Sequence, residues 1–398
     1  MAISSNDAPV SFSIFSYGFR PFFLAAGAYA ILPIIPWLLY LMNLIEPSIP
    51  LQAWHAHEMI FGFVTAGIAG FLLSAIPNWT NTPPITGKNL KILFSLWFAG
   101  RFAFWLFLFF DHPFFSYLLF IDMLLPIAQF IHVSKVLISA KNNRNYIFIG
   151  ILFSLALANF LAILDINDYS ISRSSSGAIF ATNILMITLS VIGGRVIPNF
   201  TRNYLKQKNN PYEIGKFSLV EKPALTLLIL IAVLDLFSPH SIASYMIALL
   251  ASIIHFIRFS RWGGGKTLEN PIVWVLHLAY FLMIIALLLK GGQGVVNLPF
   301  NLYLHCFTVG SVGLFMIAIM SRASLGHTGR PLIVNSVISL AYLFVLFSAL
   351  IRIVTPFFPS LLSIGMALSI GLWSVAYTLF LKIYIPILIA PRIDGKAG

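Results

Sequence analysis

Apolar segments long enough to cross a lipid bilayer recur along the whole sequence, and they restrict the chain to a membrane fold. A transmembrane helix needs about 20 predominantly apolar residues. Of the 398 residues, 59% are hydrophobic and only 9% are charged, whereas roughly a quarter of the residues in a soluble domain are charged. We therefore predict an all-α polytopic membrane protein in which residues 1–398 form a single integral-membrane domain.

Proline, glycine, asparagine and charged residues divide these apolar segments into twelve predicted transmembrane helices. The predicted spans cover residues 19–43, 54–76, 88–110, 114–138, 145–165, 176–199, 222–238, 240–259, 270–290, 301–321, 331–352 and 357–385. The even number places both ends of the chain on one side of the membrane. The seventh span is the shortest, and without it the number of crossings would be odd.

The distribution of lysine and arginine indicates which side that is, because cytoplasmic loops are enriched in both residues. If both ends are cytoplasmic, 20 of the 24 basic residues fall in cytoplasmic segments. Arg173, Lys290 and Arg352 then lie outside, and Arg101 lies within a span. The net charge of +12 is thus explained by topology and not by nucleic-acid binding. The basic loop 201–222 either contacts anionic lipid headgroups or simply anchors the chain.

Short sequence similarities predict three repeats of four helices. The segment IPNWTN (76–81) ends the second predicted span, and IPNFTR (197–202) ends the sixth. We therefore expect units at 1–138, 139–259 and 260–398, in which the second, sixth and tenth spans are equivalent.

Two histidines lie at equivalent positions of this repeat. His57 and His305 are each followed five residues later by a glycine, and both lie about 5 Å inside the outer boundary at 1.5 Å of rise per residue. Neutral imidazoles on opposing helices are typical axial ligands of a b-type haem. The alternative is that each histidine is an interfacial residue bonded to water or headgroups.

Neighbouring ionisable residues extend this hypothesis. His55 is two residues from His57, about 200° around a helix, so one metal is not expected to bind both from a regular helix. Glu58 either orients a ring N–H or only makes the mouth of the span acidic. His277 lies deep in the ninth span and is either a second ligand or an interhelical hydrogen-bonding residue.

Other charged residues suggest an ion pair and an anion site. Arg101 and Asp122 lie at similar depths in neighbouring spans, so we expect a buried pair that is structural, holds a propionate or passes protons. At the inner face, two glycine-containing loops bring together a basic cluster of Arg195, Arg202, Arg322, His327 and Arg330. They suit a carboxylate or phosphate, or simply provide positive-inside charge.

Several long motifs resemble the NnrS family of bacterial membrane proteins. They include WHAHEMIFGF, AGFLLSAIPNWT, FAGRFAFW, GGRVIPNFTRN, VLHLAY and HCFTVGSVGLFMIAIMSRASLGHTGRPL. The resemblance implies a twelve-helix protein of the bacterial inner membrane that contains haem and copper and protects cells against nitrosative stress. The positions that match these motifs are His55, His57, His277, His305, His327, Glu58, Arg101 and Arg195.

The predicted plan is also similar to that of haem–copper oxidases and nitric oxide reductases, in which histidines on the second and tenth helices hold a haem. The sixth and seventh spans contain no histidine, so the copper-binding triad of those enzymes has no counterpart. Any copper or second iron would need other ligands, for which His55 and His277 are the candidates. The candidate metal ligands as a whole are His55, His57, His277, His305 and His327.

Two functions follow as hypotheses. The first is a haem b protein that binds and consumes nitric oxide with electrons from an unidentified donor; if it is an enzyme, it is an oxidoreductase. Glu58, Arg101 and Asp122 would then handle protons. The second is a transporter or sensor for a metal or small anion without redox chemistry, favoured by the repeats and by prolines within the spans.

Overall fold

The computed structural model describes residues 13–110, 112–167, 176–210, 212, 218–296, 298–299 and 301–396, and all regular secondary structure within them is helical, as predicted. Arg173 and Lys216 of the predicted loops lie outside the described residues. The α-helices are α1 (Phe19–Tyr29), α2 (Ile35–Leu41), α3 (Leu51–His57), α4 (Thr65–Thr80), α5 (Gly87–Phe109), α6 (Pro113–Leu118), α7 (Leu124–Ser139), α8 (Ile147–Ile166), α9 (Ser176–Gln207), α10 (Ser218–Phe237), α11 (Ile242–Ser260), α12 (Pro271–Gly292), α13 (Asn301–His305), α14 (Gly313–His327), α15 (Ser336–Val354) and α16 (Leu362–Ile389).

Eleven helical segments of the described chain are long and apolar enough to cross a membrane. They correspond to the predicted spans with the exception of the seventh. Helix α10 lies at that position and packs against α9 and α11, but it contains three charged residues within 20, Glu221, Lys222 and Asp235. With α10 included, the described chain follows the predicted order of twelve helices.

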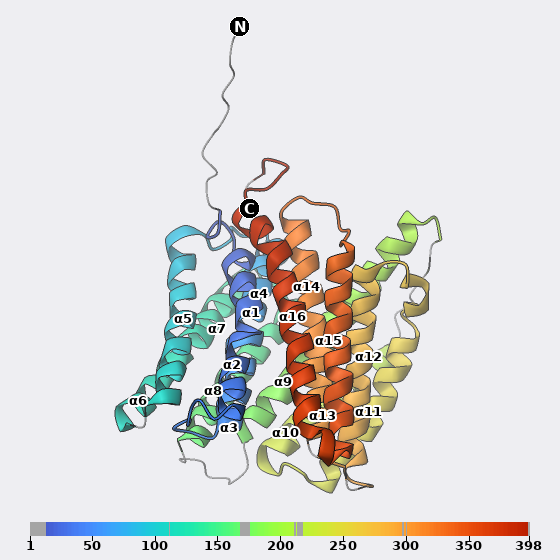
Figure 1. The fold of residues 1–398 in the computed structure, drawn as a ribbon. Coiled ribbons are helices and arrows are strands. Elements are labelled where there is room, and N and C mark those ends of the chain that lie inside the picture. Colours follow the sequence, from blue (N-terminus) through green and yellow to red (C-terminus); the bar gives the residue numbers. More distant parts are fainter. Residues whose placement is uncertain are drawn as a thin grey trace.

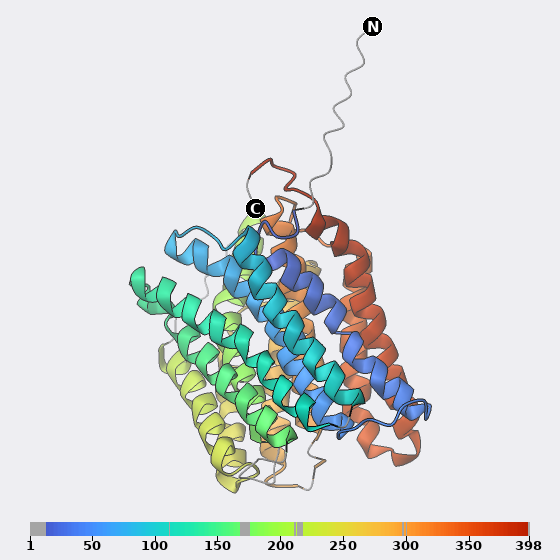
Figure 2. The same ribbon diagram turned by 90° about the vertical axis from the view of Figure 1, so that its left-hand side faces the viewer.

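The described ends of the chain meet at one face of the bundle. The backbone N–H of Ser13 donates to the carbonyl oxygen of Ile389 at 3.0 Å. Both ends lie at the top of the bundle in Figure 1 and, after a quarter turn, in Figure 2. We call this side the terminal face and the opposite side the far face. The shared face agrees with an even number of crossings.

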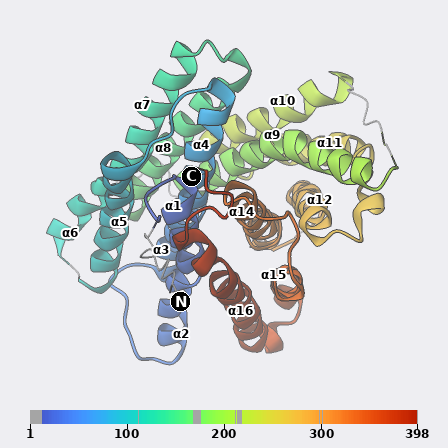
Figure 3. The same cartoon turned by 90° about the horizontal axis from the view of Figure 1, so that it is seen from above.

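Three helical segments occupy the centre of the bundle. Seen from above in Figure 3, α4, α9 and α14 lie near the middle, with the other helices around them. In the segments Leu51–Thr80, Gly177–Gln207 and Asn301–His327, 83%, 89% and 78% of the most apolar window is buried, against 67% or less in the other candidate spans. These are the second, sixth and tenth predicted spans; their equivalence as repeats stays a prediction.

Two of the central segments contain a π-helical turn at matching positions. The π segments Glu58–Val64 and Cys306–Val312 directly follow His57 and His305. A third irregularity, a 3₁₀ turn at Leu32–Ile34, separates α1 from α2 in the first span, where Pro33 and Pro36 cannot donate backbone hydrogen bonds. Both histidines therefore lie where the local geometry departs from a regular helix. Such π turns often occur at functional sites.

Candidate functional site

The predicted pair of Arg101 and Asp122 is present, and it forms the centre of a buried polar network in the half of the bundle nearer the far face. Arg101 on α5 contacts Asp122, which lies in the 3₁₀ segment Leu119–Met123. Its other terminal nitrogen donates to Glu58, the first residue of a π segment. All three residues are at most 3% exposed. Mutual pairing is what allows these charges to be buried.

His57 joins the network through both of its ring nitrogens. Nδ1 lies 3.0 Å from Oε1 of Glu58, as predicted for a group that orients the ring, and Nε2 lies 2.8 Å from Oδ1 of Asn159. Asn159 Nδ2 donates to Asp122 Oδ2 at 3.0 Å, which fixes the orientation of the amide. Both ring nitrogens thus face oxygen atoms of buried side chains. The ring therefore has no nitrogen free for a metal.

Glycines allow the helices of this network to approach one another. The hydroxyl of Tyr29 on α1 donates to Glu58. A Cβ atom at Gly62 would overlap the Tyr29 ring, and one at Gly100 would overlap Asp122. The absence of side chains at these two positions therefore lets α1, α5 and the 3₁₀ segment converge on Glu58 and Arg101.

A separate pair of histidines lies at the far face, at the ends of α3 and α13. His55 and His305 lie near each other, and Arg352 on α15 lies near both. Nδ1 of His55 is buried without a hydrogen-bond partner. His305 Nδ1 lies 2.9 Å from the Asn301 carbonyl oxygen and donates to it, so Nε2 is its acceptor nitrogen.

The equivalent positions in the sequence had suggested that His57 pairs with His305. The structure instead places His55 beside His305. The rotation of about 200° between residues two apart explains the difference. His57 points toward α8, and His55 points toward α13.

The remaining candidate histidines lie near the terminal face, away from this pair. His277 Nε2 lies 2.8 Å from Thr201 Oγ1, which is the interhelical hydrogen bond considered as its alternative role, and Nδ1 is buried without a partner. The His327 ring stacks on Tyr17 and Phe19, with centroids at 5.9 and 5.2 Å. Among the described residues, no group of three or more His, Cys, Asp or Glu side chains is placed to hold a metal ion. These residues therefore do not fit a three-ligand copper site.

Arg195 contributes to a cavity of about 400 Å³ at the terminal face, which we call the basic cavity. Arg195 Nη1 donates to Asn145 Oδ1 at 2.6 Å, and Nη2 donates to the Arg144 carbonyl oxygen at 3.0 Å. The guanidinium of Arg322 lies 3.6 Å from the ring centre of Phe200, which lines the same cavity. The cavity is lined by Phe71, Trp79, Asn142, Arg144, Asn145, Phe148, Ile192, Arg195, Val196, Asn199 and Phe200.

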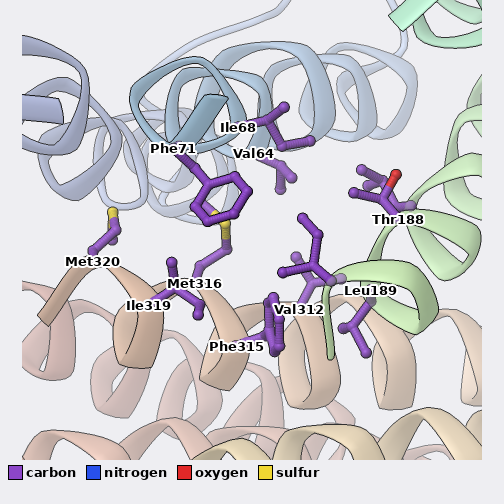
Figure 4. Close-up of a pocket in the computed structure, with 13 residues that line it drawn as sticks. Val64, Ile68, Phe71, Thr188, Leu189, Val312, Phe315, Met316, Ile319 and Met320 are labelled. Carbon is purple, nitrogen blue, oxygen red and sulfur yellow. The ribbon is translucent and has the colours of Figure 1, made fainter. Parts of the chain in front are cut away.

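A smaller apolar cavity of about 50 Å³ lies deeper, between the three central helices α4, α9 and α14. Figure 4 shows aliphatic, aromatic and methionine side chains around it, with Thr188 as the polar exception. Phe71 and Ile192 line both this cavity and the basic cavity, so the two adjoin.

Sequence reasoning missed several buried polar groups. Lys290, which we expected outside the membrane, is 2% exposed and its amine lies 2.8 Å from Asp235 Oδ2. Asn183 and Ser244 donate to the same carboxylate at 2.8 and 2.6 Å. Asp235, Asn183 and Asn159 each interrupt an apolar run, and that interruption was the available signal.

The comparison with protein families identifies one match, which covers nearly the whole chain. The family is described as NnrS protein, and the match runs over residues 13–392. None of the curated proteins matches the chain.

Proposed function

We propose that this chain, which belongs to the NnrS protein family, is a haem-containing membrane protein that binds and consumes nitric oxide. Membership of the family associates the chain with the nitric oxide response, and its long apolar helices make it a membrane protein. The observation that carries the haem proposal is the buried, unpartnered Nδ1 of His55 beside His305.

His55 and His305 would hold a haem at the far face, each through one ring nitrogen. A histidine binds a metal through one nitrogen while an acceptor fixes its other N–H. The carbonyl of Asn301 provides such an acceptor for His305, and Nδ1 of His55 is buried without a partner. Arg352, whose charge acts on both rings, suits a propionate. When bound, a b-type haem would supply an iron centre that binds nitric oxide.

The polar network around Arg101 would supply protons to this site. It begins two residues from His55, where the His57 ring contacts Glu58 and Asn159. Glu58 and Asp122 border that ring, and these contacts would pass protons toward His55. Reduction of nitric oxide consumes both protons and electrons, so a separate donor would have to provide the electrons.

We place the protein in the bacterial inner membrane with the terminal face toward the cytoplasm. The support is that 20 of the 24 basic residues then lie on the cytoplasmic side. Nitric oxide would reach the far face from the lipid, where an apolar gas concentrates.

A second candidate function is transport or sensing of a small anion without redox chemistry. The observation that favours it is the basic cavity, which adjoins the apolar cavity at the centre of the bundle.

The visible spectrum of the purified protein distinguishes the two functions. Protein isolated in neutral detergent from haem-replete cells is expected to show b-type bands in the reduced state and to shift them on addition of nitric oxide. A colourless protein, or bands that nitric oxide leaves unchanged, would contradict the proposal and favour transport or sensing.

A further inference from the structure

We propose that the basic cavity binds an organic anion, namely a carboxylate or phosphate group carried on a flat apolar body. The cavity lies between the end of α4, the α7–α8 loop and α9 at the terminal face. It is on the opposite side of the bundle from His55 and His305. Binding there requires neither haem nor nitric oxide, so the inference goes beyond the proposed function.

Positive charge gathers at this cavity, and no carboxylate of the described residues balances it. The acceptors that Arg195 contacts are neutral, an amide oxygen of Asn145 and a backbone carbonyl of Arg144. The charges of Arg144 and Arg195 repel each other. Arg322 lies just beyond, over Phe200. Within the described chain, none of these three arginines forms an ion pair with an acidic side chain, which is unfavourable unless an anion binds between them.

The acidic residues that the structure describes near the terminal face are already paired with other bases. Glu221 lies 2.5 Å from Arg258. Lys208 lies 3.1 Å from Glu269 and lowers the pKa of that carboxyl group by hydrogen bonding.

The C-terminal segment shows the same arrangement. Arg392 contacts Asp394 at 2.6 Å, and this hydrogen bond lowers the pKa of Asp394. These carboxylates stay ionised and remain with their own partners. A bound ligand is therefore the natural source of negative charge for the basic cavity.

The rest of the lining favours an organic anion over an inorganic one. Trp79 and Phe148 stack with ring centroids 5.1 Å apart, and Phe200 forms a further aromatic wall. The volume of about 400 Å³ falls within the range of roughly 300–1,000 Å³ that is typical of organic-ligand pockets. Asn142 also lines the cavity, and its side-chain amide donates to the Trp79 carbonyl oxygen at 2.7 Å. The aromatic walls would then hold the flat body, while the arginines hold the charged group.

The test is ligand-observed ¹⁹F NMR with 4-fluorobenzoate, and 4-fluorobenzamide serves as the uncharged match. Purified full-length protein in neutral detergent is expected to bind the carboxylate and not the amide. Arg195→Gln and Arg144→Gln should each weaken binding by about tenfold or more, because each removes a charge-assisted hydrogen bond. Arg144 is exposed, so its replacement separates loss of the ligand contact from loss of the fold.

Arg202→Gln is the matched control. Arg202 lies on the same helix at the same face, is exposed and does not line the cavity, so its replacement removes an equal charge and should leave binding unchanged. Equal binding of benzoate and benzamide, an affinity of Arg195→Gln equal to wild type, or equal losses in all three variants would overturn the proposal.

A second experiment distinguishes a lipid headgroup from a free solute as the bound anion. The titration is repeated in nanodiscs of phosphatidylcholine and of phosphatidylglycerol. Displacement of 4-fluorobenzoate only by phosphatidylglycerol would support the site and assign it to a lipid headgroup; equal binding in both would support it as a site for a free solute. The visible spectrum is recorded on the same samples, so failure of this site and failure of the haem proposal are read separately.

Discussion

At the scale of single residues, His55 and His57 serve different sites although one residue separates them. Both nitrogens of the His57 ring are held by Glu58 and Asn159, whereas His55 retains a buried nitrogen without a partner. The first arrangement engages both ring nitrogens, and the second leaves one nitrogen available to a ligand. Charge handling and ligation are thus divided between two adjacent histidines.

Arg101 is expected to be the residue on which the stability of the network depends most. Arg101→Met leaves Glu58 and Asp122 buried without their guanidinium partner, and removing one member of a buried ion pair costs about 3–5 kcal/mol. The free energy of unfolding, measured by denaturant titration in detergent, should fall by about this amount. Arg202→Met changes the same residue type at an exposed position and should have little effect. Equal unfolding midpoints for both variants would contradict the role of Arg101.

The sequence was sufficient to predict the Arg101–Asp122 pair, because helix geometry gives the depth of each charged residue. It was not sufficient to identify Asn159 or Tyr29 as partners. Depth does not define the direction in which a side chain points, and the packing of α1 and α8 against the network sets those contacts. For the same reason, the sequence predicted His57 and not His55 as the partner of His305.

At the scale of helices, close approach of neighbouring segments builds the site. Gly100 faces the 3₁₀ segment that contains Asp122, and Gly62 faces Tyr29. Membrane helices commonly use small residues at such contacts. These glycines appear in the sequence as ordinary small residues of apolar runs, so only the packed structure shows which of them are required.

Gly100→Ala should therefore be destabilising, whereas Gly150→Ala should not. The added Cβ at Gly100 would overlap Asp122, while the one at Gly150 meets nothing within 4 Å. Overpacking of this kind typically costs about 1–3 kcal/mol. Denaturant titration of the two variants measures the difference. A Gly100→Ala protein as stable as Gly150→Ala would show that the helices separate easily at this contact.

At the scale of the whole molecule, the two faces of the bundle carry different chemistry. The far face holds the imidazole pair and, just below it, the buried charge network. The terminal face holds the basic cavity. The number of crossings was predictable from apolar length except at α10, which carries three charged residues and packs against α9 and α11.

Cysteine labelling tests whether α10 crosses the membrane. In a Cys306→Ser background, single cysteines at Asn209 and His240 flank this helix at opposite ends. A membrane-impermeant maleimide added to intact spheroplasts should label the position 240 variant and not the position 209 variant. Inside-out vesicles, with the opposite face exposed, serve as the control and should reverse the pattern. Labelling of both positions from one side would remove α10 from the membrane and put the chain ends on opposite sides.

The assignment of the haem ligands is tested most directly by the visible spectrum of purified wild type, His55→Ala, His305→Ala and His57→Ala. We predict b-type bands in wild type, and their loss or conversion to a high-spin form in His55→Ala and His305→Ala. His57→Ala should keep the bands, because both nitrogens of that ring are engaged by the polar network. Bands that persist unchanged in both His55→Ala and His305→Ala, or that disappear only in His57→Ala, would contradict the assignment.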